Sequence, residues 1–408
     1  MQPIYSKEKQ PVIAIALLTA ACLVGDSMLY IVLPTHWREA GLSSLWEVGV
    51  LLSANRLIRL PFTPVVGWLY QRISIRTGVL FASVLAILTT LSYGYVQDFW
   101  ILLTARCVWG IAWTFLRLGG YFAVLDCSEN SNRGHLLGLY NGLFRLGSLG
   151  GMLLGGFLAD RYGLSFTAVF FAAVSLAALP LGLLYVPNCK SECCQEKNKH
   201  TVHQVLRNTN VAWALATGLV IALIYQGVFM STLSHVIKYH ETDTIVVANL
   251  ALGAATLAGL LQAIRWGWEP WVAPWFGRLS DGKNGRRPYL CLTLMLAALL
   301  FAFLPFSMPL LAWLTLLLGL QITATALTTL SDAIASDAAS AHSKTIVMTS
   351  YSFSTDLGAA LGPIIAYTLN EFWGAYVAYW FSGLLLLLLA AKWFFSPPLT
   401  ANASIDSL

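Results

Sequence analysis

The sequence predicts an all-α polytopic membrane protein with twelve transmembrane helices in two repeated six-helix bundles. Three observations support this prediction. Hydrophobic residues make up 57% of the 408 residues and charged residues only 11%, whereas soluble domains carry roughly 25% charged residues. Short polar breaks divide the chain into apolar runs of about 20 residues, the length that crosses a bilayer as a helix. Similar strings recur 210 or 211 residues apart (277 − 67 and 356 − 145).

The composition and the motifs exclude several functional classes. A soluble protein this apolar would have too little polar surface to stay dissolved, which excludes a cytosolic enzyme, a disordered scaffold and a nucleic-acid-binding domain. The short alternating segments of a transmembrane barrel are absent. The sequence has no His-Glu-x-x-His motif and no serine-nucleophile motif, and its seven histidines fall in loops or at helix ends. We therefore expect neither an enzyme nor a nucleic-acid partner.

The first six apolar runs predict the helices of the N-terminal half. They cover residues 11–34, 46–70, 77–96, 99–125, 135–158 and 164–186. The first run follows Lys7 and Lys9, as the apolar core of a signal peptide would, but it is too long and no cleavage site precedes a soluble domain. We interpret it as the first spanning helix.

Six further runs predict the helices of the C-terminal half, over residues 209–232, 245–279, 288–305, 309–332, 346–369 and 372–395. The longest internal polar stretch separates the two sets. We therefore divide the chain into an N-terminal bundle (1–187), a cytoplasmic central loop (188–208) and a C-terminal bundle with a short cytoplasmic tail (209–408). Two repeated halves are typical of transporters whose substrate site lies between the halves, near mid-membrane.

The distribution of lysine and arginine predicts the orientation in the lipid bilayer. With the N-terminus inside, the outer loops hold three of these residues, Arg38, Arg161 and Lys238. The cytoplasmic segments hold fifteen: Lys7, Lys9, Arg72, Arg76, Arg133, Lys190, Lys197, Lys199, Arg207, Arg278, Lys283, Arg286, Arg287, Lys344 and Lys392. We therefore expect a multi-pass protein with both termini in the cytoplasm.

The most specific string runs from Gly277 to Arg287 and reads Gly-Arg-Leu-Ser-Asp-Gly-Lys-Asn-Gly-Arg-Arg. It resembles the loop motif between helices 8 and 9 of the major facilitator superfamily. The resemblance implies that Gly277 allows close helix contact and that Asp281 accepts hydrogen bonds from helix ends or arginines. It also implies that the basic cluster of Arg286 and Arg287 stays on the cytoplasmic side.

A second copy of this loop motif lies between helices 2 and 3 and departs from the family pattern. It contains Gly67, Gln71 and Arg72, and Gln71 stands where the family has an acid. We expect this loop to hold the helices on the cytoplasmic side together less firmly. The helix 8–9 string also fits most of a phosphate-binding loop, but Asn284 replaces the required Ser or Thr and no strand precedes it. We expect no nucleotide and no other cofactor.

A glycine-rich string in the fifth helix, residues 147–156, resembles a motif of the twelve-helix drug:proton antiporters within that superfamily. Met152 replaces the usual proline. The small residues Gly147, Gly151, Gly155 and Gly156 let two helix backbones approach closely. Generic helix packing is the alternative interpretation of the same string.

An arginine in the fourth helix resembles a second motif of these antiporters. Arg106 is spaced from Leu102 and Gly110 as in that motif, although Trp109 replaces the usual Gln. An arginine within a membrane costs on the order of several kcal/mol and needs a partner. Asp26 in the first helix lies at a similar depth, so we expect the two to pair. If the pair opens and closes, the carboxylate carries a proton; a static packing pair is the alternative.

The charges inside the predicted helices differ between the halves. Besides Arg106, the N-terminal half holds Arg56, Arg59, Arg117 and Arg145, whereas the C-terminal half holds Arg265, Glu269 and Asp356. An arginine-rich wall indicates an anionic or zwitterionic substrate, unless acids of the other half neutralise it. Trp113, Tyr225 and Gln226 are candidates for the rest of the cavity wall.

The repeat also predicts a gate. Arg59 aligns with Glu269 (269 − 59 = 210), and Arg145 aligns with Asp356 (356 − 145 = 211). Together with the packing that the family resemblance implies, this predicts the pairs Arg145–Glu269 and Arg59–Asp356. We expect both pairs to close when the transporter faces outward and to part when it faces inward. The alternative is that each charge is satisfied within its own half.

These features together predict a secondary active transporter, and the resemblance implies a proton-coupled exporter of a small organic molecule in a bacterial inner membrane. We expect a monomer. The alternatives are a uniporter or importer of a small anionic metabolite, or an exporter of a metal-chelating metabolite. A Cys/His group in the central loop (Cys189, Cys193, Cys194, His200 and His203) does not fit a usual zinc spacing, and we expect no metal site.

Overall fold

The computed structural model describes residues 4–127, 133–186, 188, 208–240, 245–247, 250–280, 285–340, 344–374 and 376–395. Its N-terminal half contains α1 (Ile4–His36), α2 (Leu45–Leu57), α3 (Arg59–Tyr70), α4 (Ile75–Tyr95), α5 (Phe99–Cys127) and α6 (Arg133–Tyr185). Gly163, at φ 82°, interrupts α6 and divides it into two spans. Helices α2 and α3 follow each other through Ile58 and together form one span.

The C-terminal half begins with α8 (Thr209–Ile221), the π-helix η1 (Ala222–Phe229) and α9 (Met230–His240), which form one continuous span. A hairpin of β1 (Ile245–Val247) and β2 (Leu250–Leu252) follows, with Val246 opposite Ala251. The remaining helices are α10 (Ala254–Ser280), α11 (Arg286–Phe303), α12 (Leu310–Ser340), α13 (Lys344–Trp373) and α14 (Val377–Phe395).

Grouped in this way, the described residues form twelve spans, which confirms the predicted fold class. One predicted element is wrong at its start. The helix expected over 245–279 begins only at Ala254, and the residues before it form the hairpin. The β-branched run Ile245-Val246-Val247 favours a strand over a helix, and Gly253 separates the hairpin from the helix.

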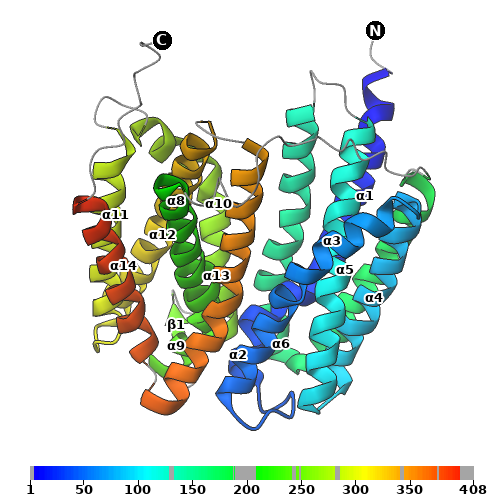
Figure 1. The fold of residues 1–408 in the computed structure, drawn as a ribbon. Helices are drawn as coiled ribbons and strands as arrows, with labels where there is room; N and C mark the ends of the chain where they lie inside the picture. The colour runs from blue at the N-terminus through cyan, green and yellow to red at the C-terminus, as the bar shows by residue number, and fades with distance from the viewer. Residues whose placement is uncertain are drawn as a thin grey trace, which may run out of the picture.

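The helices form two groups, α1–α6 and α8–α14, that stand beside each other (Figure 1). Helix α1 begins and α14 ends on the same side of the molecule, which we call the termini face. Large apolar side chains such as Leu88, Trp100, Leu184 and Leu311 are exposed around the outside. Such a belt is what lipid chains cover, so the protein is a multi-pass membrane protein.

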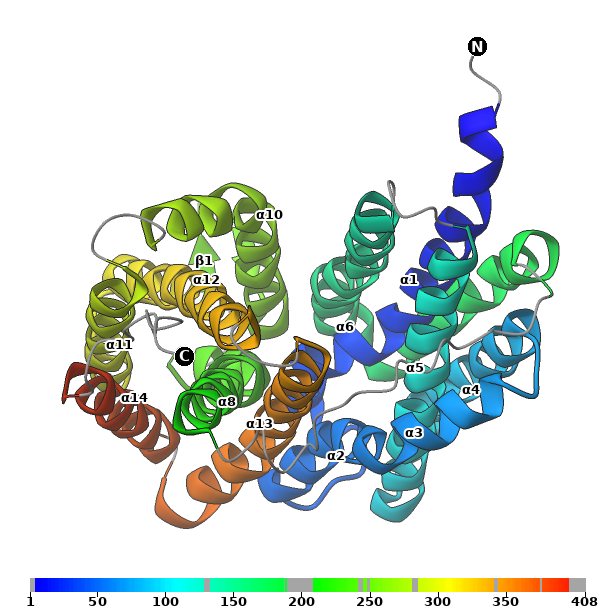
Figure 2. The same cartoon turned by 45° about the horizontal axis from the view of Figure 1, so that its top comes forward.

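The two groups contact each other mainly through three helix pairs: α2 with α13, α6 with α10, and α1 with α9. The backbones approach closely where glycines replace side chains. A Cβ on Gly49 of α2 would lie 2.7 Å from the carbonyl oxygen of Pro363 in α13, and a Cβ on Gly259 of α10 would overlap the carbonyl of Met152 in α6. Seen from nearer the termini face, the two groups stand apart (Figure 2).

The glycines of the fifth-helix string contact two different helices. A Cβ on Gly147 or Gly151 would overlap the backbone of Ala20 or Val24 in α1. A Cβ on Gly155 would lie 2.5 Å from Met28 in the same helix. Three of the four glycines thus seat α6 against α1.

The fourth glycine of the string, Gly156, faces the other half. A Cβ there would overlap the carbonyl of Ala255 in α10. The string therefore combines packing within one half with packing between the halves.

Candidate functional site

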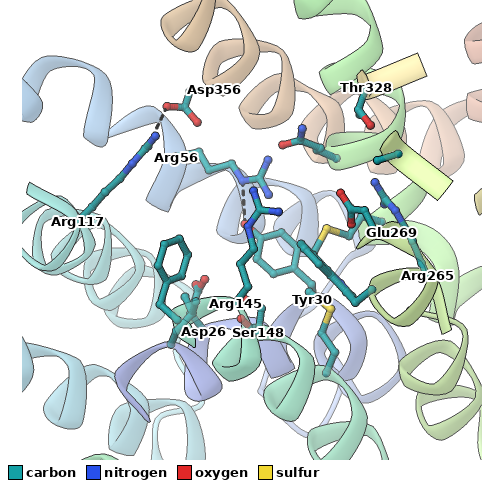
Figure 3. Close-up of a pocket in the computed structure, with 18 of the residues that line it drawn as sticks. Asp26, Tyr30, Arg56, Arg117, Arg145, Ser148, Arg265, Glu269, Thr328 and Asp356 are labelled. Carbon is teal, nitrogen blue, oxygen red and sulfur yellow. Dashed lines mark hydrogen bonds and ion pairs between the residues drawn. The ribbon is translucent and has the colours of Figure 1, made fainter. Parts of the chain in front are cut away.

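A cavity of about 700 Å³ lies between the two groups of helices and is lined from both sides. It reaches from Tyr30 and Met230 to Gly277, three residues before the end of α10 at the termini face. Nine of the predicted coupling, cavity and gate residues line it, namely Asp26, Arg56, Arg59, Trp113, Arg117, Arg145, Gln226, Glu269 and Asp356. Figure 3 shows these charged side chains converging from α1, α2, α5, α6, α10 and α13.

The predicted pair of Asp26 and Arg106 is present and buried. A terminal nitrogen of Arg106 contacts Asp26 Oδ1, and the two residues are 1% and 6% exposed. Arg106 Nε also donates to the carbonyl oxygen of Leu51, 2.9 Å away. Asn55 of α2 donates to the same carboxylate oxygen at 3.0 Å. Because Asp26 lines the cavity while Arg106 does not, the carboxylate is the member of the pair that the cavity reaches.

A chain of polar contacts links this pair to a cavity arginine. Tyr30 donates its hydroxyl to Asn55 Oδ1 at 3.5 Å, and Arg56 Nε donates to the Tyr30 hydroxyl oxygen at 3.1 Å (Figure 3). Sequence reasoning missed both Asn55 and Tyr30. Their only sequence signal is position: Asn55 precedes Arg56, and Tyr30 follows Asp26 by one helical turn on α1.

The other predicted arginines rest on aromatic rings or on one acid. Arg59 donates from Nε to the carbonyl oxygen of Asn55 at 2.9 Å, and its guanidinium lies 5.8 Å from the centre of the Trp113 ring. Arg145 lies 5.5 Å from the centre of the Trp266 ring. Arg117 pairs with Asp356 across the interface between the halves at 3.6 Å.

These contacts differ from the predicted gate pairs. Among the described residues, neither Arg145 with Glu269 nor Arg59 with Asp356 forms an ion pair, and Arg117 is the partner of Asp356. The pairs were expected to part when the cavity is open at this end, so they remain a prediction for the other state. Arg117 and Asp356 nevertheless form an ion pair between the two halves at the wall of the same cavity.

One predicted cavity residue lies elsewhere. Tyr225 is fully buried in the C-terminal half, where its ring packs against Phe229 and Phe301, and its hydroxyl lies 2.8 Å from Thr323 Oγ1. Its neighbour Gln226 lines the cavity instead. Successive residues of a helix point in different directions, and here Tyr225 faces the core of its own half while Gln226 faces the cavity.

The wall contains further polar residues. Arg265, Trp266 and Asp332 line the cavity on the C-terminal side. Arg265, which the sequence places among the helix charges, stands four residues before Glu269, so the helical repeat puts both on one face of α10. Sequence reasoning did not find Thr328 or, on the N-terminal side, Ser148, which also line the cavity.

The residues of the predicted loop motifs lie at the termini face. Arg286 pairs with Asp337 of α12 at 2.7 Å, and Arg287 donates to the carbonyl oxygen of Trp393 at the end of α14. Both contacts are within the C-terminal half. Asp281 and the Cys/His group of the central loop lie outside the described residues.

The second copy of the loop motif also lies at the termini face. Arg72 stacks on Trp68, with its guanidinium 4.1 Å from the ring centre, and Gln71 ends α3. A Cβ on Gly67 or on Gly277 would meet no atom within 4 Å in this conformation.

Polar contacts join the halves on the face opposite the termini. Asp160, in the first span of α6, accepts hydrogen bonds from the backbone nitrogen and the hydroxyl of Thr256 at the start of α10, at 2.7 and 2.6 Å. Glu371, near the end of α13, accepts from the backbone nitrogen of Leu45 at the start of α2, at 3.1 Å. Lys238 of α9 donates to the carbonyl oxygen of Thr35 in α1 at 2.8 Å.

The sequence profile of the Major Facilitator Superfamily matches residues 15–268 and 271–406 of the chain. The chain belongs to the major facilitator superfamily. It is therefore a transporter of small molecules rather than an enzyme, and its cavity lies between the two repeated halves.

Relatives within this superfamily include drug-efflux proteins. The "Tetracycline resistance protein, class H" of Pasteurella multocida is 28% identical over 225 residues, which are 53% of this chain and 56% of that protein. The "Multidrug resistance protein MdtG" of Serratia proteamaculans is 25% identical over 67% of this chain and 66% of that protein. The chain thus matches less than two thirds of the length of either relative.

Solved structures of the superfamily share the fold over the whole chain. The nucleoside transporter NupG superposes with a TM-score of 0.74 at 12% identity, covering 95% of this chain and 98% of that one. A bacterial homolog of the human lysosomal transporter Spinster superposes with a TM-score of 0.72 at 13% identity, covering 96% of this chain and 97% of that one.

Proposed function

We propose that this member of the superfamily is a proton-coupled exporter of a small organic molecule that works by alternating access. The observation that carries the proposal is the buried contact between Asp26 and Arg106 at the wall of the central cavity. The names of the two bacterial relatives, a tetracycline resistance protein and a multidrug resistance protein, support export as the direction.

The buried pair can exchange a proton with the cavity. Burial of a carboxylate is tolerated while a hydrogen-bonded arginine faces it, and it strongly disfavours the charge once that partner leaves. Asp26 therefore holds its charge while Arg106 and Asn55 are in contact with it, and takes a proton when the contact opens. Asn55 also accepts a hydrogen bond from Tyr30, which accepts one from Arg56. Movement of Arg56 in the cavity therefore affects the hydrogen bond between Asn55 and the Asp26 carboxylate.

Alternating access follows from the two ends of the cavity. In this conformation the described lining of the cavity extends to Gly277 near the termini face, while helix contacts and the hydrogen bonds of Asp160, Glu371 and Lys238 join the halves at the opposite face. The excess of lysine and arginine in segments on the termini face supports a cytoplasmic location for both termini in a bacterial inner membrane. The exporter then loads from the cytoplasm in this conformation. The cavity is complete within one chain, which supports a monomer.

The test uses cells that lack their own efflux pumps and express the chain. Accumulation of a panel that includes tetracycline, amphipathic cations and anionic aromatic acids is measured with and without a protonophore. We expect at least one compound to accumulate less in expressing cells, and the protonophore to restore its accumulation. Asp26→Asn should abolish this protonophore-sensitive export while binding persists. Asp98→Asn, which changes an acid that only caps the start of α5, is the control.

Protonophore-sensitive export that is undiminished in the Asp26→Asn variant would contradict the proton role. A second function is favoured by a separate observation, the four cavity arginines that form no ion pair with a carboxylate among the described residues. An importer or uniporter of a small anionic metabolite would use them as ligands. Uptake of an anion that the protonophore does not affect would favour this second function.

A further inference from the structure

We infer that the central cavity takes a small planar solute with two negative charges. This inference rests on the proposed transport function of the cavity, but neither on the direction of transport nor on proton coupling. It adds the chemical class of the solute to that function. Three observations lead to it: the balance of unpaired charges, the buried donors without acceptors, and the position of two arginines from opposite halves.

The first observation is an excess of unpaired positive charge. Nine ionisable side chains line the cavity, five arginines and four acids. Two of these acids are paired, Asp26 with Arg106 and Asp356 with Arg117. The other four lining arginines have no ion-pair partner among the described residues, and they face two remaining acids: Arg56, Arg59, Arg145 and Arg265, with Glu269 and Asp332. The unpaired charges thus leave the cavity two positive charges in excess.

The second observation is that the buried polar atoms without partners in this wall are all donors. Arg265 is only 7% exposed, and its Nε has no hydrogen-bond acceptor. The indole nitrogens of Trp113 and Trp266 are buried and also lack an acceptor. A buried donor without an acceptor costs roughly 1–3 kcal/mol, more when it is charged. Among the described residues that line the cavity, no acceptor is left in this condition, so a solute with acceptor groups complements this wall better than one with donor groups.

The third observation is that both halves contribute to one place. Trp266 follows Arg265 directly on α10, and the guanidinium of Arg145 from α6 lies 5.5 Å from its ring centre. Figure 3 shows Arg145 reaching into the cavity from the N-terminal side, with Glu269 and Arg265 on the side of α10. Carboxylate groups match the planar fork of a guanidinium through two parallel hydrogen bonds. The indole rings of Trp113 in α5 and Trp266 in α10, one on each side of the cavity, favour a flat solute.

The same arrangement explains how a dianion would promote transport. Closing the termini face brings α6 and α10 together and with them Arg145 and Arg265, two like charges that repel. A dianion between the two guanidinium groups removes this repulsion and bonds to both halves. Glu269, one turn along α10 from Arg265, lowers the excess positive charge but does not cancel it.

The test compares three solutes of nearly equal shape and different charge: phthalate with two negative charges, phthalamate with one, and phthalamide with none. Thermal unfolding of the purified full chain is followed with each solute at matched ionic strength, since a bound ligand stabilises the folded state. We expect the largest rise in unfolding temperature with phthalate and the smallest with phthalamide. A rise with phthalate no greater than that with phthalamide overturns the inference.

Variants locate the effect. Arg145→Gln and Arg265→Gln should each weaken phthalate binding on the order of tenfold, because each removes a charge-assisted hydrogen bond. Arg145 is exposed in the cavity, so its variant remains informative if the buried Arg265 variant does not fold. Arg38→Gln is the control, since Arg38 stacks on Trp37 outside the cavity. Equal loss in the control, or no loss in Arg145→Gln, contradicts the site.

The same measurement separates this inference from the proposed function. A charge preference in the wild type without any proton dependence of transport would sink the proposed coupling and leave the inference standing. Protonophore-sensitive export by a protein that binds phthalamide as well as phthalate would overturn the inference and leave the proposed coupling standing.

Discussion

Removing two acidic side chains on the face opposite the termini should open that face. Asp160 bonds the first turn of α10, and Glu371 bonds the first turn of α2, in each case from a helix of the other half. The backbone N–H groups of a first helical turn have no partner within their own helix, and they attract negative charge. Both contacts must break when α6 moves from α10 and α13 moves from α2, so they stabilise only the conformation that is closed there.

The size of the effect follows from the contacts. Replacing a side chain that bonds the first turn of a helix with alanine costs about 1 kcal/mol. Both carboxylates lie on exposed residues, so we take this value without any increase for burial. Two such contacts amount to about 2 kcal/mol, or a change of about 30-fold in the ratio of the two conformations. A state that is open at this face and populated at about 1% would rise to about a quarter of the molecules.

The assay is a distance measurement by electron paramagnetic resonance across this face. Spin labels at Tyr95, at the end of α4, and at Phe306, just after α11, are both exposed and report on different halves. The double alanine variant of the two acids should add a longer distance. Glu47→Ala is the matched control, because Glu47 accepts only from Ser43 of its own half. An unchanged distance distribution in the double variant, or an equal change in Glu47→Ala, would refute the reasoning.

Two further predictions use matched pairs of substitutions and thermal unfolding of the purified protein. Gly151→Ala should destabilise the protein by about 1–3 kcal/mol, because the new Cβ overlaps the backbone of Val24. The Cβ of Gly150→Ala meets no atom within 4 Å, so this variant should be close to neutral. Equal effects of the two substitutions would contradict this packing. Arg106→Ala should cost about 3–5 kcal/mol, because it leaves a buried carboxylate unpaired. Arg117→Ala should cost less than about 1 kcal/mol, because its ion pair is about one third exposed; a reversed order would show that burial does not set the value of these pairs.

Much of the fold could be predicted because the bilayer imposes its own length scale. An apolar run of about 20 residues has few structural options in a membrane, so helix number and order follow from the sequence. The pairing of Asp26 with Arg106 could be predicted for a similar reason. A charge within the membrane needs a partner, and the first half holds a single acid at the required depth.

The rotation of each helix about its axis could not be predicted to the same degree. Tyr225 and Gln226 are adjacent, and the contacts of Tyr225 with Phe301 and Thr323 hold it within its own half while Gln226 faces the cavity. The partner of Asp356 depends on the tilt between the halves, which selects Arg117 in this conformation. Hydrophobicity alone does not report such rotations in a helix that is apolar on nearly all sides.

The repeat has different consequences at the face opposite the termini and at the wall of the cavity. Asp160 and Glu371 are 211 residues apart (371 − 160), so they occupy equivalent positions of the two halves, and both are acids. They do the same work, since each bonds the start of a helix in the other half. Arg145 and Asp356 are separated by the same 211 residues and carry opposite charges. A solute between the halves meets a different wall on each side, and nothing requires the two walls to carry equal charges. Equal charges are therefore expected where the repeat only closes a face, and unequal charges are expected where it surrounds the solute.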